Sequence, residues 1–419
     1  MNQQDTAASD AGYKYATSMN AFGQIFCRAY QLAFRAALPI LPYTEPKQLD
    51  SLSVVAPLLR EKSISSVLLV ADGGVYGLGL CRALEENLAA ANISCAVYQQ
   101  KTPNPTIANV ETAREAYLAA GAQAIIAVGG GSAMDCAKVA GARIAKPKQS
   151  VANMRGLLRI LKKTPLLIAV PTTAGTGSET TLAAVITDEK THHKYPINDF
   201  PLIPDIAVLD PKLTLGLPRH ITATTGMDAL THAVEAYIGR STTAYTRAMA
   251  EEAVTLIAKN LKTAVFNGKN ETARKNMLRA SFCAGVAFTR SYVGYVHGVA
   301  HSLGGQYGVA HGLANAVILP VMLRRYGASC EKPLAALAKK AGVADASLSD
   351  SQAALAFILW IEEMNRSFNL PTRFEQIREE DIPQMAQRAA KESNPLYPVP
   401  LLMDRTELES VYRQLMKGA

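Results

Sequence analysis

Short apolar runs alternate with stretches of helical periodicity along the first half of the chain. Strands are predicted at Ser66–Asp72, Cys95–Tyr98, Ala124–Gly129, Pro165–Pro171, Ala183–Thr187 and Asp205–Leu209. Helices are predicted between the first two strands, ending near Ala91, and at Thr106–Ala120 and Ser132–Ile144. Because the strands are apolar throughout and helices separate them, the pattern predicts a doubly wound α/β domain with a mostly parallel sheet covered on both faces.

The pattern changes after Asp210 and Pro211. From Thr222 onward the periodicity is helical nearly throughout, with few β-branched runs. A chain of 419 residues is also too long for one ordinary core. We therefore predict an α/β domain over residues 1–215 and an all-helical domain over residues 216–419. The apolar stretch from Phe22 to Tyr43 predicts an amphipathic helix that packs on the body of the protein or on a partner subunit.

Charge and cysteine usage narrow the class of protein. The 43 Lys and Arg residues exceed the 35 Asp and Glu residues, for a formal charge of +8. This excess suits anionic small molecules. The most basic stretch, from Arg143 to Lys163, lacks interleaved aromatic residues, so we interpret it as solvated surface and predict no nucleic-acid partner. No apolar run reaches the roughly 18 residues of a membrane span, and we predict no membrane partner. The six cysteines show no CxxC spacing, which indicates packed thiols in a cytoplasmic protein.

The loop after the third predicted strand carries the sharpest chemical signal of this half. Gly129, Gly130 and Gly131 stand between a strand and a helix and are followed by Ser132. Glycines let a backbone approach a pyrophosphate closely, and the following helix offers free N–H groups. Asp135 lies in the first turn of that helix, where a carboxylate is favourable. Glycines often only make turns, but three at a strand-to-helix junction favour phosphate binding. Gly130, Gly131, Ser132 and Asp135 are therefore candidate cofactor residues.

Two other strand ends carry candidate cofactor residues. The segment Pro171–Glu179 presents glycines and hydroxyls, and Thr172, Thr173 and Thr176 could bond a ribose, a phosphate or a nicotinamide, although such loops also occur as plain turns. The carboxylate of Asp72, at the end of the first strand, could accept bonds from an adenosine ribose and would repel a 2′-phosphate, which favours NAD over NADP. It could equally begin a turn with the glycines that follow it.

Histidines cluster in the second half of the chain. His297 and His301 are four residues apart in a helical stretch, as are Asp228 and His232, so each pair projects from one helix face. His311 follows shortly after. A carboxylate with imidazoles suits a divalent ion such as iron or zinc. The HxxxH spacing also occurs in zinc proteases, but those need a glutamate directly after the first histidine, where this chain has a glycine.

These motifs resemble those of the iron-containing (group III) alcohol dehydrogenase family. The matching segments are Gly129–Lys138 (GGGSAMDCAK), Pro171–Glu179 (PTTAGTGSE), Gly226–Tyr237 (GMDALTHAVEAY) and the histidine-bearing segment His297–Ala316. The match covers roughly Val67 to Pro320 well and the helical remainder only loosely. The resemblance implies an α/β cofactor domain followed by an all-helical metal domain, as the periodicity does independently.

The resemblance also implies roles for individual residues. The metal ligands would be Asp228, His232, His297 and His311. His301 would stand beside the metal, near the substrate and the nicotinamide, where it could relay a proton. Cofactor contacts would come from Asp72, Asn104, Gly131, Ser132, Thr172, Thr173, Lys194 and Leu213. The implied activity is hydride transfer between a small alcohol or aldehyde and NAD, with NADP less favoured. Fe²⁺ is the implied metal and Zn²⁺ the alternative, in a homodimer or larger homo-oligomer.

Departures from the family pattern leave related activities open. The stretch before Val67 is longer than usual and lacks the early Phe-Gly-x-Gly, and Ala310 stands where proline is common. A glycerol-dehydrogenase-like zinc enzyme and a hydroxyacid–oxoacid transhydrogenase are the alternatives on the same fold. The intact ligand set disfavours a maleylacetate-reductase-like enzyme. The lack of a dense Lys and Arg set near the histidines disfavours a dehydroquinate-synthase-type lyase. A non-enzymatic binding protein would leave both the metal cluster and the dinucleotide loop idle.

Overall fold

The computed structural model describes residues 18–102, 104–189 and 193–418. By packing, these residues form two compact units, one comprising residues 18–36, 234–247 and 291–418, the other comprising residues 37–233 and 248–290. We call them the helical unit and the sheet unit. Their limits differ from the predicted boundary after residue 215, which followed the change of secondary structure and not the packing.

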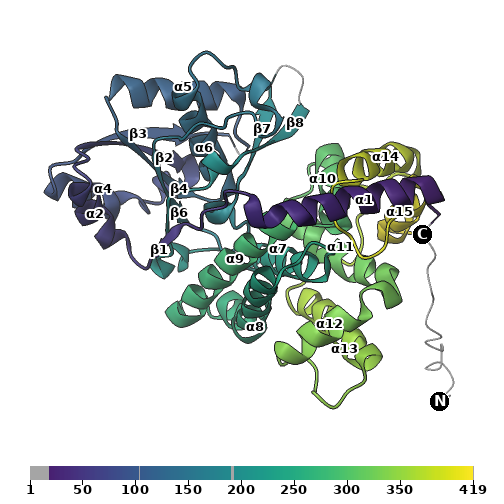
Figure 1. The fold of residues 1–419 in the computed structure, drawn as a ribbon. Helices are drawn as coiled ribbons and strands as arrows, with labels where there is room; N and C mark the ends of the chain where they lie inside the picture. The colour runs from purple at the N-terminus through teal and green to yellow at the C-terminus, as the bar shows by residue number, and fades with distance from the viewer. Residues whose placement is uncertain (1–17, 103, 190–192, 419) are drawn as a thin grey trace. The chain divides into compact units, whose positions relative to one another are not determined.

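A six-stranded sheet forms the centre of the sheet unit (Figure 1). Its strands are, in spatial order, β1 (Lys47–Leu49), β9 (Ile206–Val208), β6 (Leu166–Pro171), β4 (Ala124–Gly129), β2 (Ser66–Asp72) and β3 (Ser94–Gln100). Every pair of neighbours is parallel. The predicted parallel sheet is confirmed, and β1 is a short edge strand that the apolar pattern did not reveal.

Helices cover both faces of this sheet. They are α2 (Val55–Glu61), α4 (Arg82–Ala90), α5 (Ile107–Ala119) and α6 (Gly131–Ala145). Alternate residues of β2 enter different cores: Leu68 packs in the cluster of α5 and α6, whereas Leu69 packs in the cluster of α2 and α4. Burial on both faces explains why these strands are apolar throughout, and it confirms the doubly wound prediction.

A second sheet in this unit is small and mixed. It contains β5 (Gly156–Leu157), β8 (His193–Asn198) and β7 (Ala183–Asp188). Strand β7 pairs antiparallel with β8. The predicted strand at Ala183–Thr187 therefore exists, but it lies outside the main sheet.

After β9 the named elements are all helical, as the periodicity predicts (Figure 1). They include α7 (Arg219–Ile238), α8 (Ala244–Phe266), α9 (Glu271–Ser291), α10 (Tyr295–Tyr307), α11 (His311–Tyr326), α12 (Glu331–Lys340), α13 (Asp350–Ser367), α14 (Ile382–Ser393) and α15 (Arg405–Leu415). Most of α7, α8 and α9 belongs to the sheet unit. Leu278 and Phe282 of α9 share a core with Leu209.

The N-terminal helix α1 (Ala21–Ala37) begins within one residue of the predicted stretch. Among the described residues, no helix is both long enough and apolar enough to cross a membrane. The six cysteines are free thiols, in agreement with the absence of a CxxC spacing.

Candidate active site

The predicted cofactor loops follow neighbouring strands at one edge of the six-stranded sheet. Asp72 ends β2, Gly129 ends β4 and Pro171 ends β6. In the register of the sheet, Gly129 lies opposite Pro171. Because parallel strands end at the same edge, these loops gather where open α/β sheets bind their ligands.

Close packing favours glycine at two positions of the first loop, 129 and 131. Gly130 caps helix α6, which begins at Gly131. A Cβ atom on Gly129 would lie 2.8 Å from the Cβ of Ala133, and one on Gly131 would lie 3.3 Å from side-chain atoms of Thr176. The glycines therefore let α6 start directly against the strand end, with the N–H groups of its first turn at the loop.

The loop after β6, residues 172–177, is called the threonine loop here and is held at both ends. At its start, the N–H of Thr172 donates to the carbonyl of Gly129 at 2.9 Å. At its end, Gly177 has a φ of 62°, and a Cβ there would lie 2.8 Å from the Cα of Gly285. Only glycine fits this conformation and this contact. The hydroxyls of Thr172, Thr173 and Thr176 are thus presented from a fixed backbone.

Asp135 and Lys138, one turn apart on α6, support this loop. Lys138 is 1% exposed, and its ammonium group donates at 2.9–3.1 Å to oxygens of Ser178, Thr181 and Ala183. Asp135 accepts from the Ser178 hydroxyl and the Val185 N–H, each at 2.9 Å. Burial lowers the pKa of Lys138 to about 8, against the attraction of Asp135. The protein engages both oxygens of Asp135, so a direct cofactor contact for this residue stays a prediction.

Asp72 acts as a helix cap. Its Oδ1 accepts the N–H of Gly74 at 2.8 Å and that of Val75 at 3.2 Å. These bonds begin the short helix α3 (Gly73–Gly77). The turn-forming interpretation of Asp72 is therefore confirmed, and its contact with a ribose stays a prediction for the same carboxylate.

Other predicted cofactor residues contact one another or their loop neighbours. Lys194 donates from Nζ to the Oδ1 of Asn104 at 2.7 Å, which joins two positions far apart in the sequence. Ser132 accepts from the Nε2 of Gln100 at 2.8 Å, so the ends of β3 and the start of α6 are linked. Leu213 is buried in a short 3-10 turn after β9.

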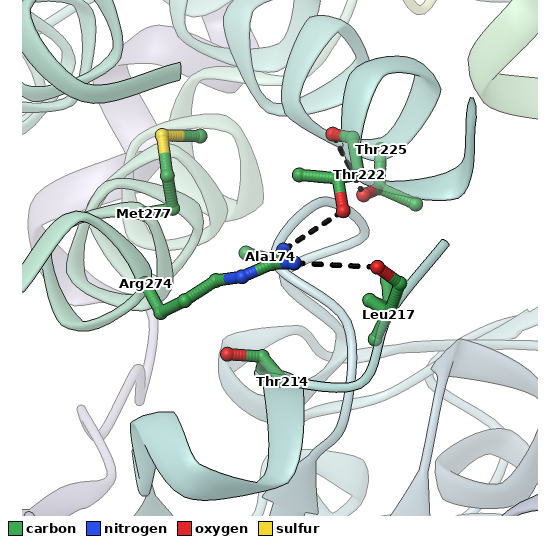
Figure 2. A pocket seen from close by; sticks show the side chains of 7 residues that line it. All are labelled: Ala174, Thr214, Leu217, Thr222, Thr225, Arg274 and Met277. Carbon is green, nitrogen blue, oxygen red and sulfur yellow. Dashed lines mark hydrogen bonds between the residues drawn. The ribbon is translucent and has the colours of Figure 1, made fainter. Parts of the chain in front are cut away.

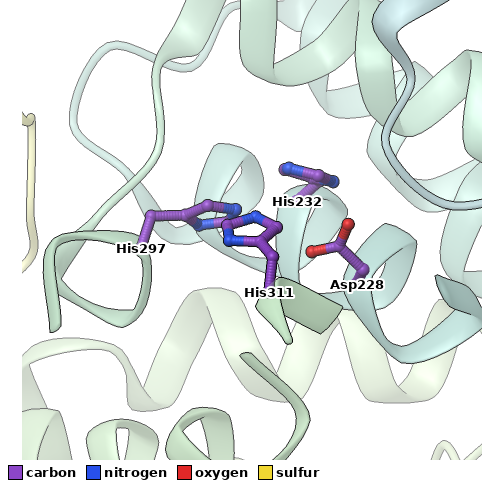
Figure 3. Close-up of side chains that lie close together, drawn as sticks. All are labelled: Asp228, His232, His297 and His311. Carbon is purple, nitrogen blue, oxygen red and sulfur yellow. The ribbon is translucent and has the colours of Figure 1, made fainter. Parts of the chain in front are cut away.

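The predicted metal ligands lie together (Figure 3). Asp228 and His232 are one turn apart on α7, His297 lies on α10, and His311 begins α11. Each residue offers one ligand atom, and these atoms all lie within 4.8 Å of one another. Asp228, His232 and His297 are buried, and His311 is half-buried. The helical spacing thus aims both ligands of α7 at one point.

Glu235, one turn after His232 on α7, fixes the orientation of His297. Its Oε2 lies 2.6 Å from the Nδ1 of His297, and its oxygens also accept the N–H groups of Gly294 and Val296 at 2.8 Å. Burial raises the pKa of Glu235 to about 7, and hydrogen bonds from the backbone N–H groups of Gly294, Val296 and His297 act against that rise. The ionised Glu235 carboxylate can only accept, so with it Nδ1 carries the proton and the Nε2 lone pair of His297 can bind an ion.

The contacts of Asn315 indicate where the lone pairs of two imidazoles point. Its Nδ2 lies 3.2 Å from the Nε2 of His297 and 3.1 Å from the Nε2 of His311. An amide N–H donates to such lone pairs, so both are directed at the same small region. Convergent imidazole lone pairs with a carboxylate are the donors that a divalent cation needs. The residues therefore fit a metal ion.

His301 stands beside the cluster, as predicted, and is held by other groups. Its ring stacks on His311 with centroids 5.2 Å apart, and it lies 5.9 Å from His297. Its Nδ1 is 2.6 Å from the Oε1 of Glu392, which also accepts the hydroxyl of Tyr397 at 2.8 Å. Burial acts to raise the pKa of Glu392, but His301 and Tyr397 outweigh it and the pKa lies below its ordinary value. The His301 side chain is 41% exposed, so its ring stays accessible.

A small cavity lies near the start of α7 (Figure 2). Its volume is about 10 Å³ and it is lined by Ala174, Thr214, Leu217, Thr222, Thr225, Arg274 and Met277. The buried guanidinium of Arg274 donates to the Thr222 hydroxyl at 2.8 Å and to the carbonyls of Leu217 and Gly268. Such a volume holds about one water molecule. The cavity therefore has no room for a dinucleotide, and Arg274 fastens the start of α7.

Several supporting residues were missed in the sequence. Glu235 follows His232 by three positions and Asn315 follows His311 by four, so helical spacing could have placed each on the ligand face. Glu392 is far from His301 along the chain and gives no local signal.

Comparison with known proteins agrees with this fold. The model of the iron-containing alcohol dehydrogenase family matches residues 48–211, and the model described as the C-terminal part of the Fe-containing alcohol dehydrogenase family matches residues 222–416. A 1,3-propanediol dehydrogenase of Citrobacter freundii is 37% identical over 369 residues, which cover 87% of this chain and 95% of that protein.

Solved structures extend the comparison to three dimensions. A crystal structure of a 1,3-propanediol oxidoreductase has a TM-score of 0.85 at 35% identity and covers 89% of this chain and 99% of its own. The sulfoacetaldehyde reductase of Bifidobacterium kashiwanohense in complex with NAD⁺ has a TM-score of 0.80 at 26% identity and covers 90% and 99%. The fold and the matched families define the class: an oxidoreductase with a parallel α/β sheet and, on its helices, a cluster of one carboxylate and three imidazoles. Within this class, the chain belongs to the iron-containing alcohol dehydrogenase family.

Proposed function

We propose that the protein is a metal-dependent, NAD-linked alcohol dehydrogenase and aldehyde reductase. The observation that carries the proposal is the convergence of one carboxylate and three imidazoles, with His301 beside them. Family membership supports it. The relative named 1,3-propanediol dehydrogenase and the reductase structure that contains NAD⁺ favour a short diol or aldehyde and a nicotinamide as the reactants.

Asp228, His232, His297 and His311 would hold the ion. We propose Fe²⁺, with Zn²⁺ as the alternative, because three imidazoles and a carboxylate suit both and the family is iron-containing. A divalent ion bound there supplies Lewis acidity to the substrate oxygen. Glu235 contributes by keeping His297 in the tautomer that binds through Nε2.

The other residues would bind the dinucleotide and exchange a proton with the substrate. Glu392 accepts a hydrogen bond from the Nδ1–H of His301. The Nε2 of that ring could then exchange a proton with the substrate oxygen. The dinucleotide would contact the loops at the sheet edge through Gly130, Gly131, Ser132, Thr172, Thr173, Thr176, Asn104, Lys194 and Leu213. Asp135 would act on it through the threonine loop that it supports.

We propose NAD as the preferred nicotinamide because Asp72 places a carboxylate at the end of β2. Asp72→Gly should therefore relax the preference, since a 2′-phosphate would no longer be repelled. Steady-state kcat/KM for NAD and for NADP in the wild-type protein and the variant measures this. An unchanged ratio would mean that Asp72 serves only as the cap of α3.

The test of the proposal is anaerobic loading with Fe²⁺ or Zn²⁺, followed by an NAD-linked activity screen. The panel contains short alcohols, diols, aldehydes, glycerol and hydroxy acids. Turnover of short alcohols or diols supports the proposal. Zinc-dependent turnover of glycerol would identify the glycerol-dehydrogenase-like alternative, and exchange between a hydroxyacid and an oxoacid without added NAD would identify the transhydrogenase. Metal binding with no turnover in any reaction would rule out the enzyme class.

We also propose that the enzyme is a cytoplasmic homodimer or larger homo-oligomer. Its six free cysteines, five of them buried, fit a reducing compartment. Light scattering on the purified protein measures the assembly, and a monomeric mass would contradict this part of the proposal.

A further inference from the structure

Helix α1 lies outside the segments that the family models match, the first of which begins at residue 48. Its exposed and buried sides are unusual for a packed helix. Phe22, Ile25 and Leu32 are exposed by 82%, 68% and 68%, whereas Gln31 is 4% exposed. A glutamine is seldom buried without a specific hydrogen-bonding task. The contacts of Gln31 therefore indicate what α1 does.

Gln31 and its neighbour Arg28 hold the segment 395–400, which follows α14. Their N–H groups donate at 2.8–3.2 Å to the carbonyl oxygens of Pro395, Tyr397, Val399 and Pro400. Arg28 also donates to the Oε1 of Gln31 at 2.8 Å, so the two side chains act as one unit. These carbonyls lie outside the named helices and strands, and α1 supplies the donors that secondary structure would otherwise provide.

Tyr397 connects this segment to His301. Its hydroxyl donates to the Oε1 of Glu392 at 2.8 Å, and the same oxygen lies 2.6 Å from the Nδ1 of His301. Its ring packs near Tyr292 with centroids 6.4 Å apart, and Phe34 of α1 meets Tyr292 edge-on at 4.9 Å. Polar and aromatic contacts thus both lead from α1 to the residue that holds Glu392.

We propose that helix α1 is a positioning element of the active site, which sets the orientation of the His301 ring through Tyr397 and Glu392. This inference rests on the proposed role of His301 and extends it to a segment that the family models do not cover. If α1 no longer holds residues 395–400, Tyr397 shifts, the shared oxygen of Glu392 is released and the ring can turn. A misplacement of about 1 Å far from the reacting atoms can cost on the order of 10²-fold in rate.

The kinetic test compares Gln31→Ala and Tyr397→Phe, with Leu32→Ala as the control on the exposed side of α1. We expect each test variant to lower kcat by about tenfold or more, with the KM for NAD and the metal content unchanged. The double variant should lose no more than the stronger single variant, because both act through one link. Unchanged kcat in both single variants, or additive losses in the double variant, would overturn the inference.

A second readout does not depend on turnover. In the zinc-loaded protein, NMR of ¹⁵N-labelled histidine should show the Nδ1 proton of His301 as a downfield signal, assigned by its loss in His301→Gln. Glu392→Ala should abolish this signal, and Gln31→Ala should broaden or remove it, while Leu32→Ala retains it. If Gln31→Ala does not fold, the nearly isosteric Gln31→Glu removes the same donors. A signal that persists unchanged in the Gln31 and Tyr397 variants would refute the positioning role, even if the protein showed no NAD-linked activity.

Discussion

The cofactor loops and the histidine cluster bury their polar groups in opposite ways. In the sheet unit, oxygens of the chain surround the Lys138 ammonium group, and Asp135 accepts two donors of the same loop. In the histidine cluster, the Glu235 carboxylate is hydrogen-bonded to the Nδ1 of His297. Asp228 and the three imidazoles direct their ligand atoms at one another.

This difference indicates which of the two regions can satisfy its buried polar groups without a bound ligand. A buried charge is costly unless it is paired and hydrogen-bonded. The chain itself supplies hydrogen-bond acceptors to the Lys138 ammonium group, so the threonine loop should keep its shape without a ligand. In the cluster, the ligand atoms of one carboxylate and three imidazoles converge, and a cation would stabilise them together. Loss of metal should therefore affect the two regions differently, and four substitutions test this contrast.

The largest effect is expected from His311→Ala. Removal of one imidazole leaves an incomplete donor set, so the bound metal should be lost and turnover should fall below detection. Metal analysis and the NAD-linked assay measure both. The control is His220→Ala, because His220 is exposed on the first turn of α7. Full metal content in His311→Ala would show that the ion binds elsewhere.

Lys138→Met should cost the next largest amount, in stability. The substitution leaves the carboxylate of Asp135 and the carbonyls of Thr181 and Ala183 without their cation, and such a loss typically costs about 3–5 kcal/mol. Urea unfolding of the metal-free protein measures it, with Lys148→Met as an exposed control. A change no larger than that of the control would mean that the loop does not depend on internal charge pairing.

Glu179→Gln should remove a pH dependence of stability. Burial raises the pKa of this carboxyl from 4.5 to about 7. Between pH 4.5 and pH 7, the folded state therefore binds more protons at this carboxyl than the unfolded state does. The stability that the carboxyl contributes is complete below pH 4.5 and is lost as the pH rises through 7. The contribution is roughly 3 kcal/mol. Unfolding at pH 5 and pH 8 should show a smaller difference in Glu179→Gln than in the exposed control Glu61→Gln. Equal differences would contradict the raised pKa.

Glu235→Gln should give the smallest effect and sharpen the contrast most. The amide keeps the size of the side chain but loses the carboxylate that orients His297. Metal affinity should fall about 10–100-fold, the usual cost of altering a group that orients a ligand. Competition with a metal chelator measures the affinity, and the exposed variant Glu271→Gln at the start of α9 provides a control without a ligand contact. Unchanged affinity would show that Glu235 serves only to cap the N–H groups of Gly294 and Val296.

Strands and ligand spacing could be predicted from the sequence because both are local signals. The bounds of β2 and β4 agree with the prediction, since residues buried on both faces of a sheet are apolar throughout. Strand β8, whose sequence HKYPIN mixes polar residues and proline, shows no such run and was missed.

Contacts between distant segments could not be predicted in this way. The spacing of Asp228 and His232 placed both on one face of a helix, but nothing local links either to His297 or His311. The family resemblance supplied that link. It did not supply Glu392 or Gln31, whose partners are set by the packing of α14 and α1 in the helical unit.

Helix α7 carries two of the candidate ligands and, one turn later, the carboxylate that orients a third. Each residue of an α-helix turns the chain by about 100°. A single insertion or deletion between His232 and Glu235 would therefore swing that carboxylate away from His297 while leaving Asp228 and His232 in register. The length of this short stretch should therefore be fixed among functional variants of the enzyme.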